Sequence, residues 1–276
     1  MENKIGNFIL DLFFPKFCLN CQREGTFLCE DCKAILDISN SHHPPPNFGG
    51  GQTINLNDLY WAVEYKNSLI KNLIKLFKYE PFVKELAKDL ASLIIDHFQL
   101  VKEDKSSFLP LAAARVLDEK PVFLKKNLDY VLVPVPLEKR KLKWRGFNQA
   151  EEVGKEIAKF LKIPLFNDVL IKNRETLAQV ELSEEERKEN IKEAFSCQNL
   201  KKIYPVRELK KFGYSKNIDF SNGVKEKKIL LVDDVYTTGS TMKECAKVLK
   251  KAGAKEVIGI VIARAAPGQD QFKSVQ

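Results

Sequence analysis

The sequence predicts an α/β fold in which helices cover both faces of a parallel sheet, with a small four-cysteine segment at the N-terminus. Three observations carry this prediction. Short apolar runs alternate with stretches whose apolar residues recur every three or four positions, as buried strands and amphipathic helices do. A Thr/Gly-rich loop follows one apolar run, and four of the six cysteines fall within residues 18–32. Strands that alternate with helices favour a parallel sheet.

The individual elements follow from the same periodicities. Strands are predicted at residues 59–65, 130–133, 228–232 and 256–262, and helices at residues 69–77, 86–94, 150–160 and 242–249. Pro134 and Pro136 close the second strand with a stiff turn, and Gly253 fits the position just after the last helix.

These elements divide the chain into three regions. Residues 1–40 hold a short apolar segment and the cysteines, residues 41–57 form a linker, and residues 58–276 form the sheet domain. Three prolines and three glycines in the linker exclude a helix or a central strand there. Residues 102–127 and 200–224 look like insertions into the sheet domain.

Composition narrows the class of protein. Of the 276 residues, 44% are apolar and 30% are charged, which is typical of a soluble globular protein. No apolar run approaches the ~18 residues that a membrane helix needs, and the N-terminus lacks the features of a secretory signal. We therefore expect a cytoplasmic protein without membrane insertion.

The net charge of +8 is unevenly distributed. Residues 200–228 hold nine Lys/Arg against three Asp/Glu, and residues 139–145 add five more basic side chains. Such clusters attract phosphates or nucleic acids. Aromatic residues lie among the lysines of the first cluster and suit base stacking: Tyr204, Phe212, Tyr214 and Phe220. A solvated surface or ordinary packing would explain both patterns equally well.

The most informative motif follows the strand at residues 228–232. Asp233 and Asp234 end this strand, and a loop of Thr, Gly and Ser then opens a helix. Backbone N–H groups and hydroxyls at a helix N-terminus bind phosphate. Carboxylates repel phosphate, so the acids need sugar hydroxyls or a bridging Mg²⁺ as partners. A ribose 5-phosphate ligand satisfies both halves, with the loop contributed by Thr237, Thr238, Gly239, Ser240 and Thr241. The alternative is a plain strand–turn–helix capped by Thr and Ser.

The four clustered cysteines form two C-x2-C pairs. Two such pairs can supply four thiolates to a closed tetrahedral Zn²⁺ site, which is structural because it has no open position. The expected ligands are Cys18, Cys21, Cys29 and Cys32. A redox pair or an iron–sulfur site is the alternative. His42 and His43 are expected in the linker, and Cys197 and Cys245 are not expected to be ligands. Since each domain should bury its own core, we expect loss of the finger to stay local.

A third set of residues lies between these motifs. Val133-Pro134-Val135-Pro136-Leu137 precedes Arg145-Gly146-Phe147-Asn148-Gln149-Ala150. Further along follow Arg174, Thr176, Gln179, Leu182, Ser183, Arg187, Asn190, Ala194 and Phe195. The acidic pair with its Thr/Gly loop is similar to the phosphate-binding motif of type I phosphoribosyltransferases. Taken with the cysteines, most of the chain resembles the ComF family, of the ComFC type.

The resemblance implies a zinc finger joined to a phosphoribosyltransferase-like domain that binds phosphoribosyl pyrophosphate with Mg²⁺. Asp233 and Asp234 would contact the ribose hydroxyls, and the loop would hold the 5′-phosphate. Arg145, with Arg140 and Lys143, would offer charge to the pyrophosphate, so the catalytic candidates are Asp233, Asp234 and Arg145. Some relatives serve DNA uptake in natural transformation, which implies single-stranded DNA and helicase-type partners.

Two functions remain compatible with the sequence. One is an active phosphoribosyltransferase that releases pyrophosphate, including one of nucleotide or cofactor salvage unrelated to competence. The other is a competence protein that keeps the ligand site as a sensor or scaffold. No side chain stands out as a general base, and no residue pattern identifies an acceptor.

Overall fold

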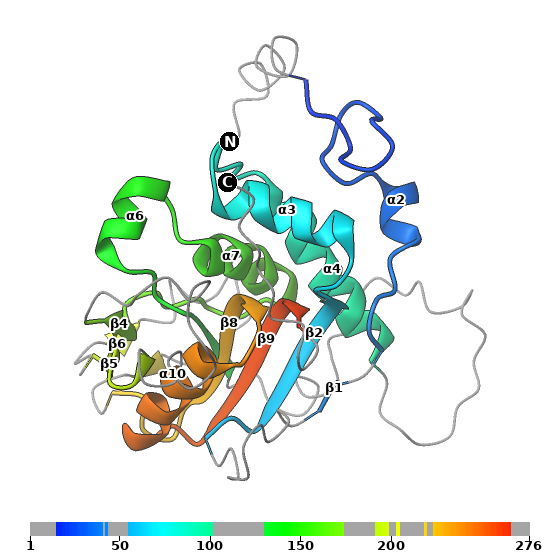
Figure 1. Cartoon of the computed structure of the whole chain (residues 1–276). Helices are drawn as coiled ribbons and strands as arrows, with labels where there is room; N and C mark the ends of the chain where they lie inside the picture. Colours follow the sequence, from blue (N-terminus) through cyan, green and yellow to red (C-terminus); the bar gives the residue numbers. More distant parts are fainter. Residues whose placement is uncertain are drawn as a thin grey trace, which may run out of the picture.

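The centre of the molecule is a five-stranded sheet. The acidic pair Asp233 and Asp234 lies near the carboxyl end of one of its strands. The computed structural model describes residues 15–40, 42–43, 55–101, 130–173, 191–198, 203–204, 218–219 and 223–265. The strand order is β1-β2-β9-β8-β3 (Figure 1). The four main strands are parallel and β1 is antiparallel to β2. Their bounds are β1 His42–His43, β2 Asp58–Glu64, β3 Tyr130–Pro134, β8 Lys228–Tyr236 and β9 Glu256–Arg264.

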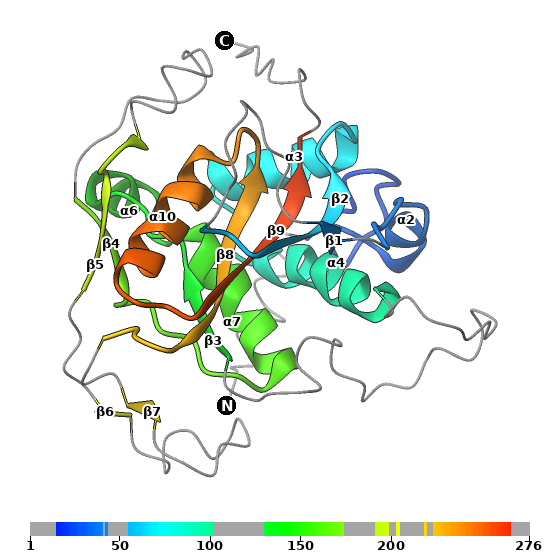
Figure 2. The same cartoon turned by 90° about the horizontal axis from the view of Figure 1, so that it is seen from below.

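Helices cover both faces of this sheet, as Figures 1 and 2 show. Their bounds are α2 Glu30–Ala34, α3 Ser68–Lys78, α4 Leu86–Leu100, α6 Lys139–Arg145, α7 Gln149–Leu161 and α10 Ser240–Lys251. Two small antiparallel pairs lie outside the main sheet: β4 (Leu170–Lys172) with β5 (Phe195–Cys197), and β6 (Ile203–Tyr204) with β7 (Ile218–Asp219). Within the described residues, no helix has the length and apolar character needed to cross a membrane.

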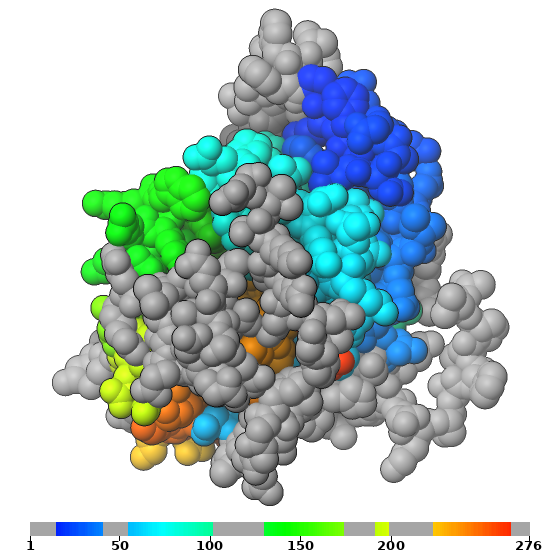
Figure 3. Space-filling view, viewed as in Figure 1, coloured from blue at the N-terminus to red at the C-terminus, as the bar shows by residue number. Residues whose placement is uncertain are grey.

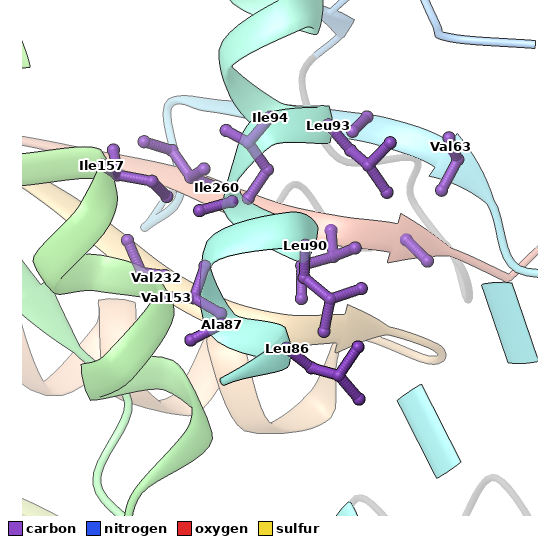
Figure 4. Packing of buried hydrophobic residues seen from close by; sticks show 14 of the residues in the cluster. Val63, Leu86, Ala87, Leu90, Leu93, Ile94, Val153, Ile157, Val232 and Ile260 are labelled. Carbon is purple, nitrogen blue, oxygen red and sulfur yellow. The ribbon is translucent and has the colours of Figure 1, made fainter. Parts of the chain in front are cut away.

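The two faces of β8 explain how the core is divided. Successive side chains of a strand point to opposite faces. Leu230 and Val232 therefore join one apolar cluster with residues of α3, α4 and α7, whereas Ile229 and Leu231 join a second cluster with residues of α10. Figure 4 shows the first cluster, in which Val153 of α7 and Leu90 of α4 lie over Val232 and Ile260. A strand buried on both faces needs an uninterrupted apolar run, and β8 has one.

The predicted strands and helices of the sheet domain are confirmed, with shifts at their ends. Helix α4 continues to Leu100, six residues beyond its predicted end, and β8 continues through Tyr236, so that Asp233 and Asp234 lie within the strand rather than just after it. Gly253 follows α10 with a φ of 92°, as expected of a residue that ends a helix. The sequence did not predict the short helix α2, the two small antiparallel pairs, α6 or β1. The basic run Lys139–Arg145 is a helix, and His42–His43 of the expected linker pair with β2.

The cysteine segment does not have a core of its own, and the expectation that it would is wrong. Cys18, Leu28 and Cys29 belong to the same apolar cluster as α3, α4 and the sheet. Polar contacts join the segment to α4 as well: Lys33 Nζ lies 2.7 Å from Asp96 Oδ2, and Thr26 Oγ1 lies 3.4 Å from Asp89 Oδ2. Figure 3 shows the blue segment resting against the cyan helices. A segment of this size buries too little apolar surface by itself, so it packs against α4.

Candidate functional site

The acidic pair occupies the part of β8 that extends beyond its neighbour β3. The last contact between these strands is the hydrogen bond from Val135 N to Val232 O, at 2.8 Å. Beyond it, among the described residues, β8 pairs with β9, in which Val261 lies beside Asp233. The pairing of β3 with β8 ends at Pro134 and Val232, and the chain that leaves β3 leads into α6. Carboxyl ends of parallel strands are where ligands of open α/β sheets bind.

The alternation of the strand sends the two carboxylates to opposite sides. Asp234 lies on the side of α3 and α7, where its Oδ1 is 2.8 Å from Lys78 Nζ. Both side chains are largely buried, with 10% exposure for Asp234 and 21% for Lys78. Burial lowers the pKa of Arg145, and the charge of nearby Asp234 opposes that shift. Asp234 therefore sits between two cationic side chains.

Asp233 lies on the side of α10 and β4. Burial, followed by the charge of Asp234, raises the pKa of Asp233 from 3.8 to about 7, although Lys78 and Lys172 oppose the shift. Lys172, at the end of β4, has its pKa lowered by burial and by Lys141. Burial also raises the pKa of the Cys245 thiol, and the carboxylate of Asp233 raises it further. Asp233 therefore holds a proton more readily than a free carboxyl because its pKa is raised, whereas Asp234 is paired with Lys78.

Asp233 should make the protein less stable as the pH rises. Because its folded pKa is raised from 3.8 to about 7, the folded state keeps a proton in this interval that the unfolded state releases. The free energy of unfolding therefore falls as the pH rises from 3.8 to about 7, by at most about 1.4 kcal/mol per pKa unit. Asp233→Asn should abolish this fall and be more stable than the native protein above about pH 7. Denaturant titrations at about pH 5 and pH 8 measure the effect, and equal pH dependence in both proteins would contradict it.

One buried glutamine, Gln149, links Arg145 to the end of α3 next to Lys78. Gln149 is 2% exposed, its Oε1 accepts a hydrogen bond from an Arg145 guanidinium nitrogen at 3.0 Å, and its Nε2 donates to Phe77 O at 3.1 Å. The ring of Tyr79 lies 5.7 Å from the Arg145 guanidinium carbon. Asn148 caps α7 at Ala150 N and donates to Val135 O. Asn148 and Gln149 thus bind the backbone at Val135, the guanidinium of Arg145 and the end of α3.

The Thr/Gly loop connects the end of β8 to α10. Thr238 and Ser240 hydrogen-bond each other through their hydroxyls at 2.8 Å, and Ser240 N lies 3.4 Å from Thr238 Oγ1. No side chain caps α10 at its N-cap residue, Gly239. Gly239 has a φ of 73°, and a Cβ there would overlap the ring of Tyr236, which is 1% exposed. The loop therefore lies directly against a buried ring that holds the backbone in place.

The four cysteines of the N-terminal segment come together as the spacing predicts. Their Sγ atoms all lie within 4.8 Å of one another. Tetrahedral zinc with Zn–S bonds of ~2.3 Å needs sulfurs roughly 3.8 Å apart. Burial alone would raise the pKa of Cys18, but backbone N–H groups of Cys21, Cys29 and Asn20 outweigh it and lower the pKa to about 6. Four thiols so arranged fit a closed metal site, and neither Cys197 nor Cys245 belongs to the group.

The acids themselves do not fit a directly coordinated Mg²⁺. Asp234 Oδ1 is occupied by Lys78, and Asp233 Oδ1 accepts the backbone N–H of Asp234 at 2.9 Å. Mg²⁺ prefers several unencumbered oxygen ligands in octahedral geometry. The geometry therefore gives no support to a bridging Mg²⁺ held by the acidic pair.

Sequence reasoning found some residues of the site and missed others. The structure brings together Asp233, Asp234 and Arg145, and the loop residues 237–241 follow in order. It adds Lys78 and Lys172, which no local motif marked. Of the third set of residues, Arg174, Thr176, Gln179, Leu182, Ser183, Arg187 and Asn190 lie outside the described residues. So do Phe212, Tyr214 and Phe220, all of residues 102–127 and most of residues 200–222.

Comparison with known proteins identifies a domain in the C-terminal half of the chain and several relatives. Residues 148–274, from the N-cap of α7 through β8, the Thr/Gly loop, α10 and β9, match the phosphoribosyl transferase domain. The chain is similar to Competence protein F of Haemophilus influenzae, with 33% identity over 50% of this chain and 52% of that protein. It is also similar to Competence protein ComFC of Streptococcus pneumoniae, with 32% identity over 59% of each chain.

Other relatives are named for DNA utilization rather than for competence. DNA utilization protein YhgH of Escherichia coli is 31% identical over 46% of this chain and 45% of that protein. The matches thus span roughly half the length of these curated relatives. Residues 148–274 thus match a phosphoribosyl transferase domain, and the chain is similar to competence and DNA utilization proteins over about half of its length.

Proposed function

We propose that this protein binds phosphoribosyl pyrophosphate at the carboxyl end of β8 and serves the uptake or use of DNA. One observation carries the ligand assignment. Two carboxylates near the end of β8 are followed two residues later by a hydroxyl-rich loop at a helix N-terminus, and Lys78, Arg145 and Lys172 lie near the acids. Acceptors for sugar hydroxyls beside donors for phosphate are what a ribosyl phosphate requires.

Each part of the ligand then has its own partners. The 5′-phosphate would lie on loop residues Thr237–Thr241 at the positive end of the α10 dipole. The ribose hydroxyls would donate to Asp233 and Asp234, and the pyrophosphate would lie near Arg145. Mg²⁺ would arrive bound to the pyrophosphate rather than to the acids. The four cysteines would hold one structural Zn²⁺.

Titration calorimetry tests this assignment. Thr238→Ala and Ser240→Ala each remove a hydroxyl from the loop, and hydrogen bonds to charged groups contribute ~1.5–3 kcal/mol. Each variant should therefore bind phosphoribosyl pyrophosphate about tenfold or more weakly. Asp233→Asn and Asp234→Asn should instead keep or improve the affinity for inorganic phosphate while losing preference for the ribosyl ligand. Ser92→Ala is the matched control, because the Ser92 hydroxyl donates a hydrogen bond to Asp89 O within α4, away from the loop.

Equal affinity of all these proteins for phosphoribosyl pyrophosphate would contradict the proposal. The loop would then be a plain turn between β8 and α10. Loss of phosphate binding in the Asp→Asn variants would also contradict the division of the ligand between acids and loop.

The role in DNA handling rests on the relatives' names and on the surface of α6. Lys139, Arg140 and Lys143 are exposed on this helix beside Trp144, which is 55% exposed. Figure 1 shows α6 at the periphery of the molecule, away from the sheet. Exposed cations beside an exposed aromatic ring suit single-stranded DNA, through phosphate contacts and base stacking. We place the protein in the cytoplasm with single-stranded DNA and helicase-type proteins as partners.

Two measurements separate the catalytic alternative from the accessory role. Release of pyrophosphate from phosphoribosyl pyrophosphate in the presence of candidate acceptors would identify an active transferase, including one of nucleotide or cofactor salvage unrelated to competence. Binding of single-stranded DNA that weakens steeply with salt, without pyrophosphate release, would support the accessory role.

A further inference from the structure

The ion pair between Lys78 and Asp234 sits where the proposed ligand would bind. Lys78 is the last residue of α3, and its ammonium lies 2.8 Å from Asp234 Oδ1 with only 21% of the side chain exposed. Withdrawing two charges from water costs free energy that their mutual attraction only partly offsets, so a buried pair by itself is weak evidence for a stabilising role. Its position at the acids calls for another explanation.

The chemistry of a ribosyl pyrophosphate complements this pair. Ribose hydroxyls donate hydrogen bonds and pyrophosphate oxygens accept them. When such a ligand enters, its ribose hydroxyls can donate hydrogen bonds to Asp234 while its pyrophosphate oxygens accept hydrogen bonds from Lys78. Both charges then exchange one partner for another, and neither is left buried and unpaired.

The surrounding residues hold Lys78 beside a second cation. Gln149 donates from Nε2 to Phe77 O, the residue before Lys78, and accepts from Arg145 at its Oε1. Tyr79, the residue after Lys78, has its ring beside the Arg145 guanidinium. Lys78 and Arg145 thus flank Asp234 from α3 and from the end of α6, on one face of the sheet. Two cations on one side offer a place for a group with more than one negative charge.

We propose that Lys78 binds pyrophosphate: it leaves Asp234 and pairs with the ligand's pyrophosphate when the ligand binds. Lys78 thereby makes the protein prefer ligands with a pyrophosphate group over ligands without it. This inference rests on the proposed function, because it assigns one part of the same ligand. It also accounts for the poor fit of the acids to Mg²⁺, since the ammonium already supplies the cation that Asp234 needs.

Calorimetry with two ligands tests the inference. Phosphoribosyl pyrophosphate and ribose 5-phosphate share the sugar and the 5′-phosphate, and only the first carries pyrophosphate. In Lys78→Met the ratio of the two affinities should fall about tenfold or more, which is the expected loss of one charge-assisted contact. Lys78→Arg should keep most of the preference because it keeps the charge. Lys75→Met, an exposed lysine one turn earlier on α3, is the matched control and should leave the ratio unchanged.

The possible outcomes are distinct. An unchanged ratio in Lys78→Met, in a protein whose thermal melt shows it folded, overturns the inference and leaves the proposed function standing. Equal weakening of both ligands also overturns it, because Lys78 would then act through the fold. If the native protein binds neither ligand, the proposed function and this inference fall together.

Discussion

Replacing Cys29 by serine is expected to destabilise the whole protein and not only the cysteine segment. The change removes one thiolate from the proposed Zn²⁺ site, and structural zinc contributes ~10 kcal/mol or more to the folding of small zinc-finger peptides. In this chain the segment shares an apolar cluster with α3 and α4. Its unfolding would expose the face of α4 beneath Leu28 and would break the pair between Lys33 and Asp96. We expect the free energy of unfolding to fall by about 4 kcal/mol or more.

Denaturant unfolding followed by tryptophan fluorescence measures this effect in the sheet, because Trp61 lies in β2. Cys197→Ser is the matched control, since Cys197 lies on β5 outside the cysteine cluster. A chelator that removes zinc from the native protein should reproduce the Cys29→Ser result. Two separate transitions, with the sheet unfolding at the native denaturant concentration, would show instead that the segment is independent.

Gly239→Ala should displace the Thr/Gly loop, which weakens phosphate binding, and should also lower the free energy of unfolding. A Cβ at this position would fall on the ring of Tyr236, which is 1% exposed and belongs to the core. Overpacking costs typically ~1–3 kcal/mol, and a left-handed backbone costs an L-residue ~1–2 kcal/mol more. We therefore expect a loss of roughly 2–5 kcal/mol in the free energy of unfolding. The displaced loop should bind both phosphoribosyl pyrophosphate and inorganic phosphate weakly.

Gly146→Ala separates these two contributions. Gly146 has a φ of 77°, close to the 73° of Gly239, but an added Cβ there has no atom within 4 Å. This control should therefore pay only the backbone cost of ~1–2 kcal/mol. Thermal and denaturant melts of both variants give the comparison. If Gly239→Ala were no worse than Gly146→Ala, the contact with Tyr236 would not constrain the loop.

Local patterns in the sequence were enough to predict the main elements and part of the site. The apolar runs of β3, β8 and β9 predict strands because each is buried on both faces and therefore carries no alternating polar residues. The acidic pair and its loop were recognisable because all their residues are consecutive. The four cysteines were equally evident, since a metal site built from two C-x2-C pairs has a fixed spacing.

The end of β8 was harder to predict from the sequence. Asp233 and Asp234 look like the residues that follow a strand, because two carboxylates rarely continue a buried run. In the structure the strand continues through them, since β9 still pairs with this stretch as far as Arg264. Backbone pairing with a neighbour therefore decided where the strand ends, and it also decided that the two acids point to opposite faces.

The sequence by itself determined the individual strands, the acids, the loop and the cysteine spacing, because each of these depends on residues close together in the chain. Only the tertiary structure decided that Lys78 pairs with Asp234, that Lys172 lies on the side of Asp233, and that the cysteine segment shares its core with α4. From the neighbouring sequence alone, a lysine at the end of a helix or strand cannot be distinguished from a solvated surface lysine. Whether such a charge faces water or a buried carboxylate depends on elements that are distant in sequence, and these come together only when the chain folds.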